Sequence, residues 1–192
     1  MGEGLHVTRP RVLMVDDEKK VADAYALRLN DVAEASVAYG GEEALDTVDN
    51  EPPPDVVLLD RHMPELSGDE VLDRLRDRNL RTRIIMVTAI DPDIGILEMP
   101  FDDYLSKPVD RGDLHTAVDQ QCQVLAYELL GEYFQFAATR GVVAAELDNG
   151  DAHDRFDELE NEIDELESRV RGLLPEATDL LDAFDEIERK GY

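Results

Sequence analysis

The sequence is poor in cysteine, tryptophan and basic residues. Its 192 residues contain one cysteine, Cys122, and no tryptophan. A single cysteine excludes a disulfide within the chain and fits a reducing, cytoplasmic setting, where we expect Cys122 to be a small apolar helix residue. No stretch approaches the ~20 apolar residues of a membrane span. The first ten residues lack the apolar core of a signal peptide, so no membrane association is expected.

The shortage of basic residues leaves a large negative charge. Only 19 Lys and Arg face 46 Asp and Glu, which gives a net charge of -27. Such a surface repels DNA, RNA and anionic membranes, so nucleic acid is an unlikely partner. The acidic residues are spread along the whole chain rather than gathered in a tail. This distribution favours adaptation to high salt, as in a halophile, over an acidic interaction tail.

The first part of the chain alternates between apolar strand patterns and amphipathic helix patterns. This alternation predicts an α/β fold, a doubly wound parallel sheet of five strands with helices on both faces. Between the fourth and fifth strands, Pro92, Gly95 and Pro100 leave room only for a short or irregular helix. Strands are predicted at residues 11–15, 35–39, 56–59, 82–88 and 102–106, helices at 18–30, 42–49 and 68–78, and a disordered lead at 1–9.

The second part, from Asp110 onward, has no strand pattern. Helix-forming residues run to about Leu147, and a turn is predicted at residues 148–151. Apolar residues then alternate by three and four in a heptad seam, which Pro175 ends before a last amphipathic segment at 176–189. This part is predicted to be an all-α helical hairpin or coiled coil, paired internally or with a second chain. The seam residues are Phe156, Leu159, Ile163, Leu166, Val170 and Leu173.

Polar residues stand at the carboxyl ends of four predicted strands. Asp16 and Asp17 follow the first, Asp60 the third, Thr88 ends the fourth, and Lys107 follows the fifth. Parallel strands bring these ends to one sheet edge, where ligands bind. Converging carboxylates need a cation, and hard oxygen ligands suit Mg²⁺. A carboxylate beside Mg²⁺ can attack phosphorus, while Lys107 and the Thr88 hydroxyl bind phosphoryl oxygens. Taken singly, these residues could equally be loop caps and turn residues.

Together these motifs resemble the response-regulator receiver domain of two-component signalling. The resemblance covers residues 10–119 and implies a flavodoxin-like five-stranded parallel sheet. The segment between Thr88 and Lys107, which contributes to the output face of receivers, is shorter and more broken than the family pattern. The matching elements are Asp16-Asp17, Asp60 with Met63-Pro64 and Gly68, Thr88-Ala89, and Lys107-Pro108.

The resemblance implies a phosphorylation site that depends on Mg²⁺. Asp60 would accept a phosphoryl group from a sensor histidine kinase. Asp17 would be a direct Mg²⁺ ligand, Asp16 would act mainly through a bound water, and the backbone carbonyl of His62 would complete the metal site. The chain would then be no enzyme beyond self-phosphorylation and slow autodephosphorylation.

The resemblance also implies how the phosphorylated state is read. Lys107 would pair with the phosphoryl group, Thr88 would be the switch hydroxyl, and Tyr104, three residues before Lys107, the switch aromatic. These three residues lie at or near the ends of the fourth and fifth predicted strands.

Residues 120–192 resemble the HalX domain that follows receivers in haloarchaea. The likeness rests on Tyr127, on the Glu132-Tyr133 pair and on the acidic heptad segment after a glycine turn. It implies an output or oligomerisation domain whose first helix continues from the last receiver helix. Self-association or binding of a partner protein through these helices is therefore expected.

Three alternatives to this phosphorylation-controlled output role stay open. Most receivers carry DNA-binding domains, which would make the chain a transcriptional regulator, although its few Arg and Lys do not cluster as a groove-reading helix requires. The chain could also be a phosphorelay intermediate or phosphate sink. An enzymatic activity in the tail is disfavoured because residues 120–192 carry no catalytic grouping.

Overall fold

The computed structural model describes residues 9–89, 99–145 and 151–190. The chain divides into two compact units, residues 9–125 and the residues from 126 onward. Three predicted features fall largely outside the described residues. These are the lead at 1–9, the irregular segment around Pro92 and the turn near Gly150. The predicted boundary between residues 119 and 120 stays a prediction.

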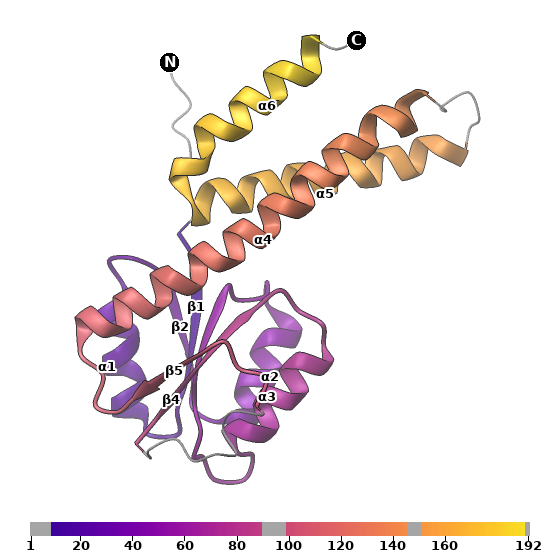
Figure 1. Ribbon diagram of the computed structural model, residues 1–192. Helices are drawn as coiled ribbons and strands as arrows, with labels where there is room; N and C mark the ends of the chain where they lie inside the picture. The colour runs from indigo at the N-terminus through magenta and orange to yellow at the C-terminus, as the bar shows by residue number, and fades with distance from the viewer. Residues whose placement is uncertain (1–8, 90–98, 146–150, 191–192) are drawn as a thin grey trace, which may run out of the picture. The chain divides into compact units, whose positions relative to one another are not determined.

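Five parallel strands form the sheet of the first unit, in the order β2-β1-β3-β4-β5 (Figure 1). This confirms the predicted flavodoxin-like sheet. The order reverses between β1 and β3, and such a switch point is where ligands bind in open α/β sheets. The strands are β1 (Arg11–Val15), β2 (Glu34–Ala38), β3 (Val56–Asp60), β4 (Arg83–Thr88) and β5 (Asp103–Ser106).

The central strands are buried on both faces and the edge strands are not. Every residue of β3 is buried, whereas β2 and β5 at the two edges are partly exposed. A continuous Val/Leu run suits the centre of a parallel sheet, which explains why β3 was easy to predict. The predicted end of β2 at Tyr39 is wrong by one residue. The Tyr39 amide donates to Oε2 of Glu43 at 2.9 Å, so the ladder stops at Ala38.

Helices cover both faces of the sheet. The helices α2 (Gly41–Asn50) and α3 (Gly68–Asp77) lie on one side, and α1 (Lys19–Leu29) lies on the other (Figure 1). Alternate strand residues point to the α2–α3 side, as the period of two requires. The core on that side includes Leu13, Val15, Val57, Leu59, Ile84 and Met86 from the strands and Ala44, Leu45, Val48, Val71, Leu72 and Leu75 from the helices.

The helix α4 (Arg111–Ala145) begins against α1. The Arg28 guanidinium of α1 donates to the Val109 carbonyl at 2.6 Å, and the Arg28 carbonyl lies 2.7 Å from Nε2 of His115 on α4. Cys122, further along α4, is buried, and burial raises the pKa of its thiol to about 12. A thiol with this pKa stays protonated at neutral pH, in agreement with the expected apolar role.

Helices make up the second unit. From residue 126, α4 is followed by α5 (Asp151–Leu173), a 3₁₀ turn η2 (Pro175–Ala177) and α6 (Thr178–Lys190). An aromatic cluster joins α4 and α6, with ring centroids of Phe134 and Phe184 4.8 Å apart and of Tyr133 and Phe184 6.0 Å apart. Within the described part of the chain, no helix has the length and apolar content needed to span a membrane.

The heptad seam shifts by one residue at the end of α5. Ile163, Leu166 and Val170 are buried as predicted, but Leu174 and not Leu173 is the next fully buried position. The reason is the turn at Pro175, where the Ala177 amide donates to the Leu174 carbonyl at 2.9 Å. On α6, Leu180 is 51% exposed and its neighbour Leu181 is buried.

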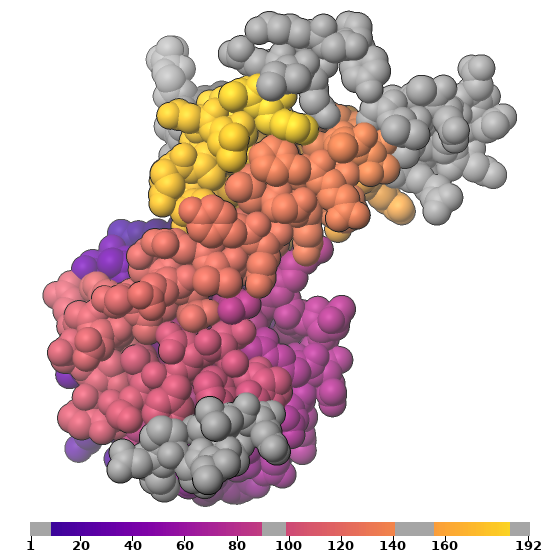
Figure 2. Space-filling model, in the orientation of Figure 1, coloured from indigo at the N-terminus to yellow at the C-terminus, as the bar shows by residue number. Residues whose placement is uncertain are grey.

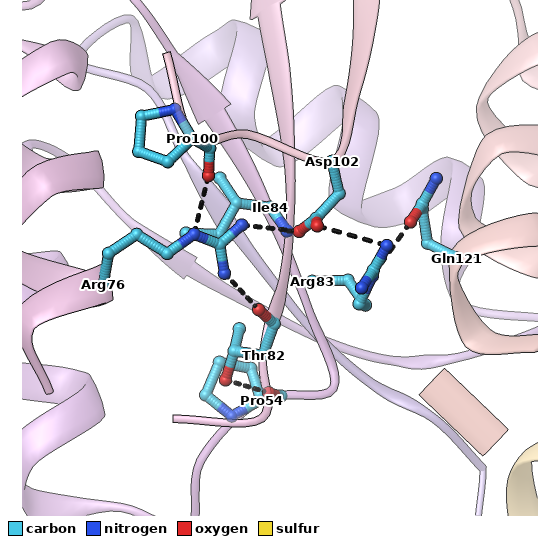
Figure 3. Close-up of polar contacts among 8 residues, drawn as sticks. All are labelled: Pro54, Arg76, Thr82, Arg83, Ile84, Pro100, Asp102 and Gln121. Carbon is cyan, nitrogen blue, oxygen red and sulfur yellow. Dashed lines mark hydrogen bonds and ion pairs between the residues drawn. The ribbon is translucent and has the colours of Figure 1, made fainter. Parts of the chain in front are cut away.

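A carboxylate, Asp102, fastens the start of β5 (Figure 3). Arg76 of α3 donates to Oδ2 of Asp102 at 2.6 Å, and Arg83 of β4 lies 3.1 Å from Oδ1. The Ile84 amide also donates to Oδ2, at 2.6 Å, while Arg83 donates to Oε1 of Gln121 at 3.1 Å. This network joins α3, β4, β5 and α4, and it explains why the polar side chain of Gln121 is buried.

Removing Arg76 should destabilise the first unit. Arg76→Met leaves the Asp102 carboxylate with one cation fewer and removes the donors to the Pro100 and Thr82 carbonyls. We expect the free energy of unfolding to fall by about 2–3 kcal/mol, because two of the groups left behind, the Thr82 carbonyl and the Asp102 carboxylate, are largely shielded from water. Urea unfolding followed by circular dichroism at high salt measures the loss.

Arg78→Met is the matched control for Arg76→Met. Arg78 makes a two-pronged ion pair with Asp49, but the Asp49 side chain is 50% exposed. An exposed pair of this kind contributes less than about 1 kcal/mol. Equal losses in the two variants would contradict a special role for the Asp102 network.

Candidate functional site

Three carboxylates meet at the carboxyl ends of β1 and β3. Asp60 is the last residue of β3 and Asp16 follows β1, and both are buried. The register pairs Val15 with Leu59, so the residues that follow lie side by side. Carboxylate oxygens of Asp16, Asp17 and Asp60 all lie within 4.8 Å of one another. The cluster therefore stands at the switch point of the sheet.

Lys107 brings a positive charge into this cluster. Its Nζ lies 2.6 Å from Oδ2 of Asp16 and 2.9 Å from Oδ1 of Asp60. Its amide donates to the Thr88 carbonyl at 2.7 Å, which extends the pairing of β5 with β4. One ammonium against the three carboxylates of Asp16, Asp17 and Asp60 leaves two excess negative charges if all are ionised. The site is thus set up to receive a further cation.

The electrostatics of the pair Asp60 and Lys107 follow from burial and from their neighbours. Burial raises the pKa of Asp60 above its usual value, and the charges of Asp16 and Asp17 add to the rise, whereas Lys107 opposes it. Burial alone would lower the pKa of Lys107, but hydrogen bonds and charge from Asp16 and Asp60 outweigh burial and raise it. Lys107 therefore stays charged at neutral pH, and negative charge on Asp60 is costly without a partner.

The donor set fits a hard divalent cation. Three carboxylates converge within one ligand shell, and two of them are shielded from water. Carboxylate oxygens are the ligands that Mg²⁺ takes in proteins, usually together with water and phosphate oxygens. Both oxygens of Asp16 already have protein partners, since Oδ1 accepts the Glu18 amide at 2.8 Å and Oδ2 contacts Lys107. Asp17 and Asp60 are therefore the better placed direct ligands.

The remaining predicted site residues lie on β4, on β5 and in the loop after β3. Thr88 ends β4, is fully buried and pairs with Ser106. Tyr104 lies on β5 opposite Met86, and its half-buried ring packs on the core beside Phe101. His62 comes two residues after Asp60 in the loop that leaves β3, with its side chain exposed. The structure thus places Thr88 and Lys107 at the same sheet edge as the carboxylates.

Contacts that no sequence motif signalled fix the loop after Asp60. Arg61 donates through Nε and Nη2 to the two oxygens of Asp69, at 3.0 and 3.2 Å. The Gly68 amide donates to the Arg61 carbonyl at 2.9 Å, and Glu65 adopts a left-handed backbone with φ of 67°. Eight positions separate Arg61 from Asp69 across an irregular loop, so no periodic pattern in the sequence links them. This two-pronged contact, which we call the Arg61–Asp69 fork, holds the backbone next to Asp60 against α3.

Gly68 is required by its close approach to Asp60, and Gly68→Ala tests this. A Cβ at position 68 would overlap the Asp60 carbonyl oxygen and lie 2.8 Å from Cα of Arg61. Because both neighbours are backbone, we expect unfolding free energy to fall by about 2 kcal/mol and Mg²⁺ affinity to fall by about tenfold. Titration calorimetry measures the affinity.

Gly112→Ala serves as the control for Gly68→Ala. There a Cβ would meet only Oδ1 of the Asp110 side chain, at 3.3 Å, so the change would disturb only the hydrogen bond that this oxygen accepts from the Asp113 amide, away from the carboxylate cluster. Mg²⁺ affinity should be unchanged. A Gly68→Ala variant that binds Mg²⁺ as the control does would show that the loop does not position Asp60.

Two families match consecutive parts of the chain. The response regulator receiver domain matches residues 12–119, and the HalX domain matches residues 123–188. Solved structures agree with the first match. A CheY-like receiver domain protein from Methanospirillum hungatei is 26% identical, with a TM-score of 0.59 over 63% of this chain and 99% of its own. The receiver domain of a Francisella response regulator is 33% identical, with a TM-score of 0.55 over 59% and 96%.

Curated relatives extend the likeness. A protein from Haloferax volcanii, named as a candidate transcriptional regulator, is 42% identical over 145 residues, which is 74% of this chain and 24% of that protein. The alkaline phosphatase synthesis transcriptional regulatory protein PhoP of Bacillus subtilis is 36% identical over 115 residues, 56% of this chain and 46% of PhoP. The chain thus spans less than half the length of these relatives. It belongs to the response regulator receiver family, with a HalX domain following the receiver domain.

Proposed function

We propose that Asp60 accepts a phosphoryl group from a sensor histidine kinase and that the helical domain reads the phosphorylated state. One observation carries this proposal: Asp60 is buried at a strand end, ion-paired with Lys107 and clustered with Asp16 and Asp17. Receiver domains typically have histidine kinases as partners, which supports the choice of donor. A cytoplasmic location is part of the proposal.

The transfer is a displacement at phosphorus. An oxygen of the Asp60 carboxylate forms a bond to phosphorus as the bond to the donor's histidine nitrogen breaks, and the electron pair leaves with that nitrogen. Bound Mg²⁺ supplies charge neutralisation for the phosphoryl oxygens. Lys107, now held between Asp16 and Asp60, would turn to pair with one of those oxygens, and the Thr88 hydroxyl would bind another.

Four groups would hold the metal in this proposal. Asp60 and Asp17 would supply carboxylate oxygens as direct ligands, and the backbone carbonyl of His62 would be the third direct ligand from the protein. Asp16 would act mainly through a bound water, which is supported by the contacts that already occupy both of its oxygens. The Arg61–Asp69 fork supports this arrangement because it fixes the loop that carries His62.

The last part of the proposal concerns how the helical domain responds to the phosphorylated state. Thr88 and Tyr104 lie on neighbouring strands, β4 and β5, and would respond together to a phosphoryl group on Asp60. The response would change self-association of the HalX helices or their binding of a partner protein. Slow loss of the phosphoryl group would time the signal. Hydrolysis of other substrates is not part of this function.

Labelling tests the proposal. The full chain is incubated at high salt with acetyl phosphate, whose transferred phosphoryl group is radiolabelled, with Mg²⁺ or with a chelator. We expect stable protein-bound label only with Mg²⁺, and its loss under alkaline conditions that hydrolyse acyl phosphates. Protein that stays unlabelled with Mg²⁺, or that labels equally in chelator, would contradict the proposal.

Transcriptional regulation is a second candidate, favoured by the names of several relatives. The net charge of -27 opposes direct binding to DNA, so an effect on transcription would run through another protein. A gel shift with genomic DNA fragments at high salt separates direct binding to DNA from action through another protein. A specific shift by the chain alone would favour direct binding to DNA.

A further inference from the structure

Side chains of α1 bind both backbone polar groups of Val109. The Val109 amide donates to the Tyr25 hydroxyl at 3.2 Å, and the Val109 carbonyl accepts from Nη1 of Arg28 at 2.6 Å. Val109 lies in the connection between β5 and α4, where no sheet or helix supplies partners for its backbone. Both Tyr25 and Val109 are buried. In the view of Figure 2, little of the indigo α1 is visible behind the pink residues that include the start of α4.

Tyr25 and Arg28 form a single unit, which we call the Val109 clamp. They are three positions apart on α1 and therefore lie on the same side of the helix. The Arg28 guanidinium lies over the Tyr25 ring, 5.2 Å from its centroid, so the buried ring also supports the cation. The clamp thus fixes Val109 through two hydrogen bonds whose donor and acceptor groups are themselves in contact.

The clamp acts two residues after Lys107. The Lys107 amide donates to the Thr88 carbonyl at 2.7 Å, which anchors the chain to β4 on one side. The clamp anchors the chain to α1 on the other side, and Pro108 between the two anchors has a fixed φ. The backbone that carries the Lys107 side chain is therefore held from two different elements.

We propose that Tyr25 and Arg28 are positioning residues for phosphoryl transfer, which hold Lys107 beside Asp60 by fixing the backbone of Val109. The inference rests on the proposed function and gives a role in it to two residues that touch none of the reacting atoms. The lysine stem is long and flexible, so its ammonium stays 2.9 Å from Asp60 only if its backbone is fixed. A shift of about 1 Å in such a group is enough to slow a reaction.

Initial labelling rates of the full chain at high salt test the proposal. Radiolabelled acetyl phosphate with Mg²⁺ is the donor, because a small donor does not depend on docking of a protein to α1. Tyr25→Phe removes one hydroxyl and should slow labelling about tenfold. Arg28→Met should act in the same direction, and Arg28→Lys, which keeps a donor for the Val109 carbonyl, should recover most of the rate.

Thr82→Val and Lys107→Ala make the test specific. Thr82→Val removes another buried hydroxyl hydrogen bond, to the Pro54 carbonyl at the amino end of β4, and should label at the wild-type rate. In a Lys107→Ala background, Tyr25→Phe should slow labelling by less than about twofold, because the clamp acts through the lysine. Equal slowing in both backgrounds, no slowing by Tyr25→Phe, or equal slowing by Thr82→Val would overturn the proposal.

Urea unfolding of the wild type, Tyr25→Phe, Lys107→Ala and the double variant needs neither donor nor metal. The losses of unfolding free energy in the two single variants should sum to more than the loss in the double variant, because the clamp supports the ion pairs of Lys107. Strictly additive losses would overturn the proposal. A wild type that fails to label would refute the proposed function, and the unfolding measurements would still decide whether the clamp holds Lys107.

Discussion

Asp60→Asn is expected to reduce phosphoryl labelling to background while making the fold more stable. The asparagine amide is not a nucleophile, and Asp16 cannot replace Asp60 because Glu18 and Lys107 occupy its two oxygens. Stability moves the other way because burial raises the pKa of Asp60, so its charge costs folding free energy at neutral pH. Radiolabel incorporation and urea unfolding measure the two effects.

The gain in stability from Asp60→Asn should depend on pH with a definite sign. The folded pKa of Asp60 lies above its usual value of 3.8, so the wild type bears the full cost above the folded pKa and loses it completely only below the unfolded pKa. The difference between the two proteins should shrink as pH falls towards 3.8. Asp73→Asn on α3, an exposed carboxylate, is the matched control and should retain full labelling. Residual label on Asp60→Asn would place the acceptor elsewhere.

Lys107→Ala should slow phosphorylation without weakening Mg²⁺ binding. Lys107 is the cation placed to pair with a phosphoryl group at Asp60, and loss of one such donor slows group transfer by about 100-fold or more. Mg²⁺ affinity should be maintained, because the ammonium competes with a metal for Asp16 and Asp60. Initial labelling rates and titration calorimetry separate the two quantities.

Lys107→Ala should also destabilise the fold, in contrast to Asp60→Asn. The buried Asp16 carboxylate would lose its ion pair, at a cost of about 3 kcal/mol. Since the folded pKa of Lys107 is raised above 10.5, this contribution is fully present at neutral pH and is lost only as pH rises past that folded pKa. Lys20→Ala, an exposed lysine on α1, is the control and should change neither rate nor stability. Weaker Mg²⁺ binding in Lys107→Ala would show that the lysine orders the metal ligands.

The convergence of the site could be predicted from the sequence because parallel strands end at one edge of a sheet. Asp16, Asp60 and Lys107 each follow a short apolar run, and the register of β1 with β3 then fixes their proximity. The fold was predictable for the same reason, since its strands and helices have distinct periods. The hydrogen bonds that orient the site depend on tertiary geometry and left no such signal.

Long-range polar contacts and helix phase were beyond prediction. Arg76 and Asp102 are 26 positions apart and meet only because α3 packs beside the start of β5. Arg61 and Asp69 meet across a loop whose path depends on the fit of Gly68 against Asp60. The heptad pattern was right through Val170 but could not foresee that the turn at Pro175 would advance the seam by one residue.

Mapping of the phosphoryl group tests the central claim most directly. The full chain is phosphorylated with acetyl phosphate and Mg²⁺ at high salt, the acyl phosphate is reduced with borohydride, and peptides are sequenced by mass spectrometry. We predict that Asp60 is converted to homoserine and that the conversion requires Mg²⁺. Conversion at Asp16, Asp17 or another residue, with Asp60 unmodified, would contradict the assignment of Asp60 as the phosphoryl acceptor.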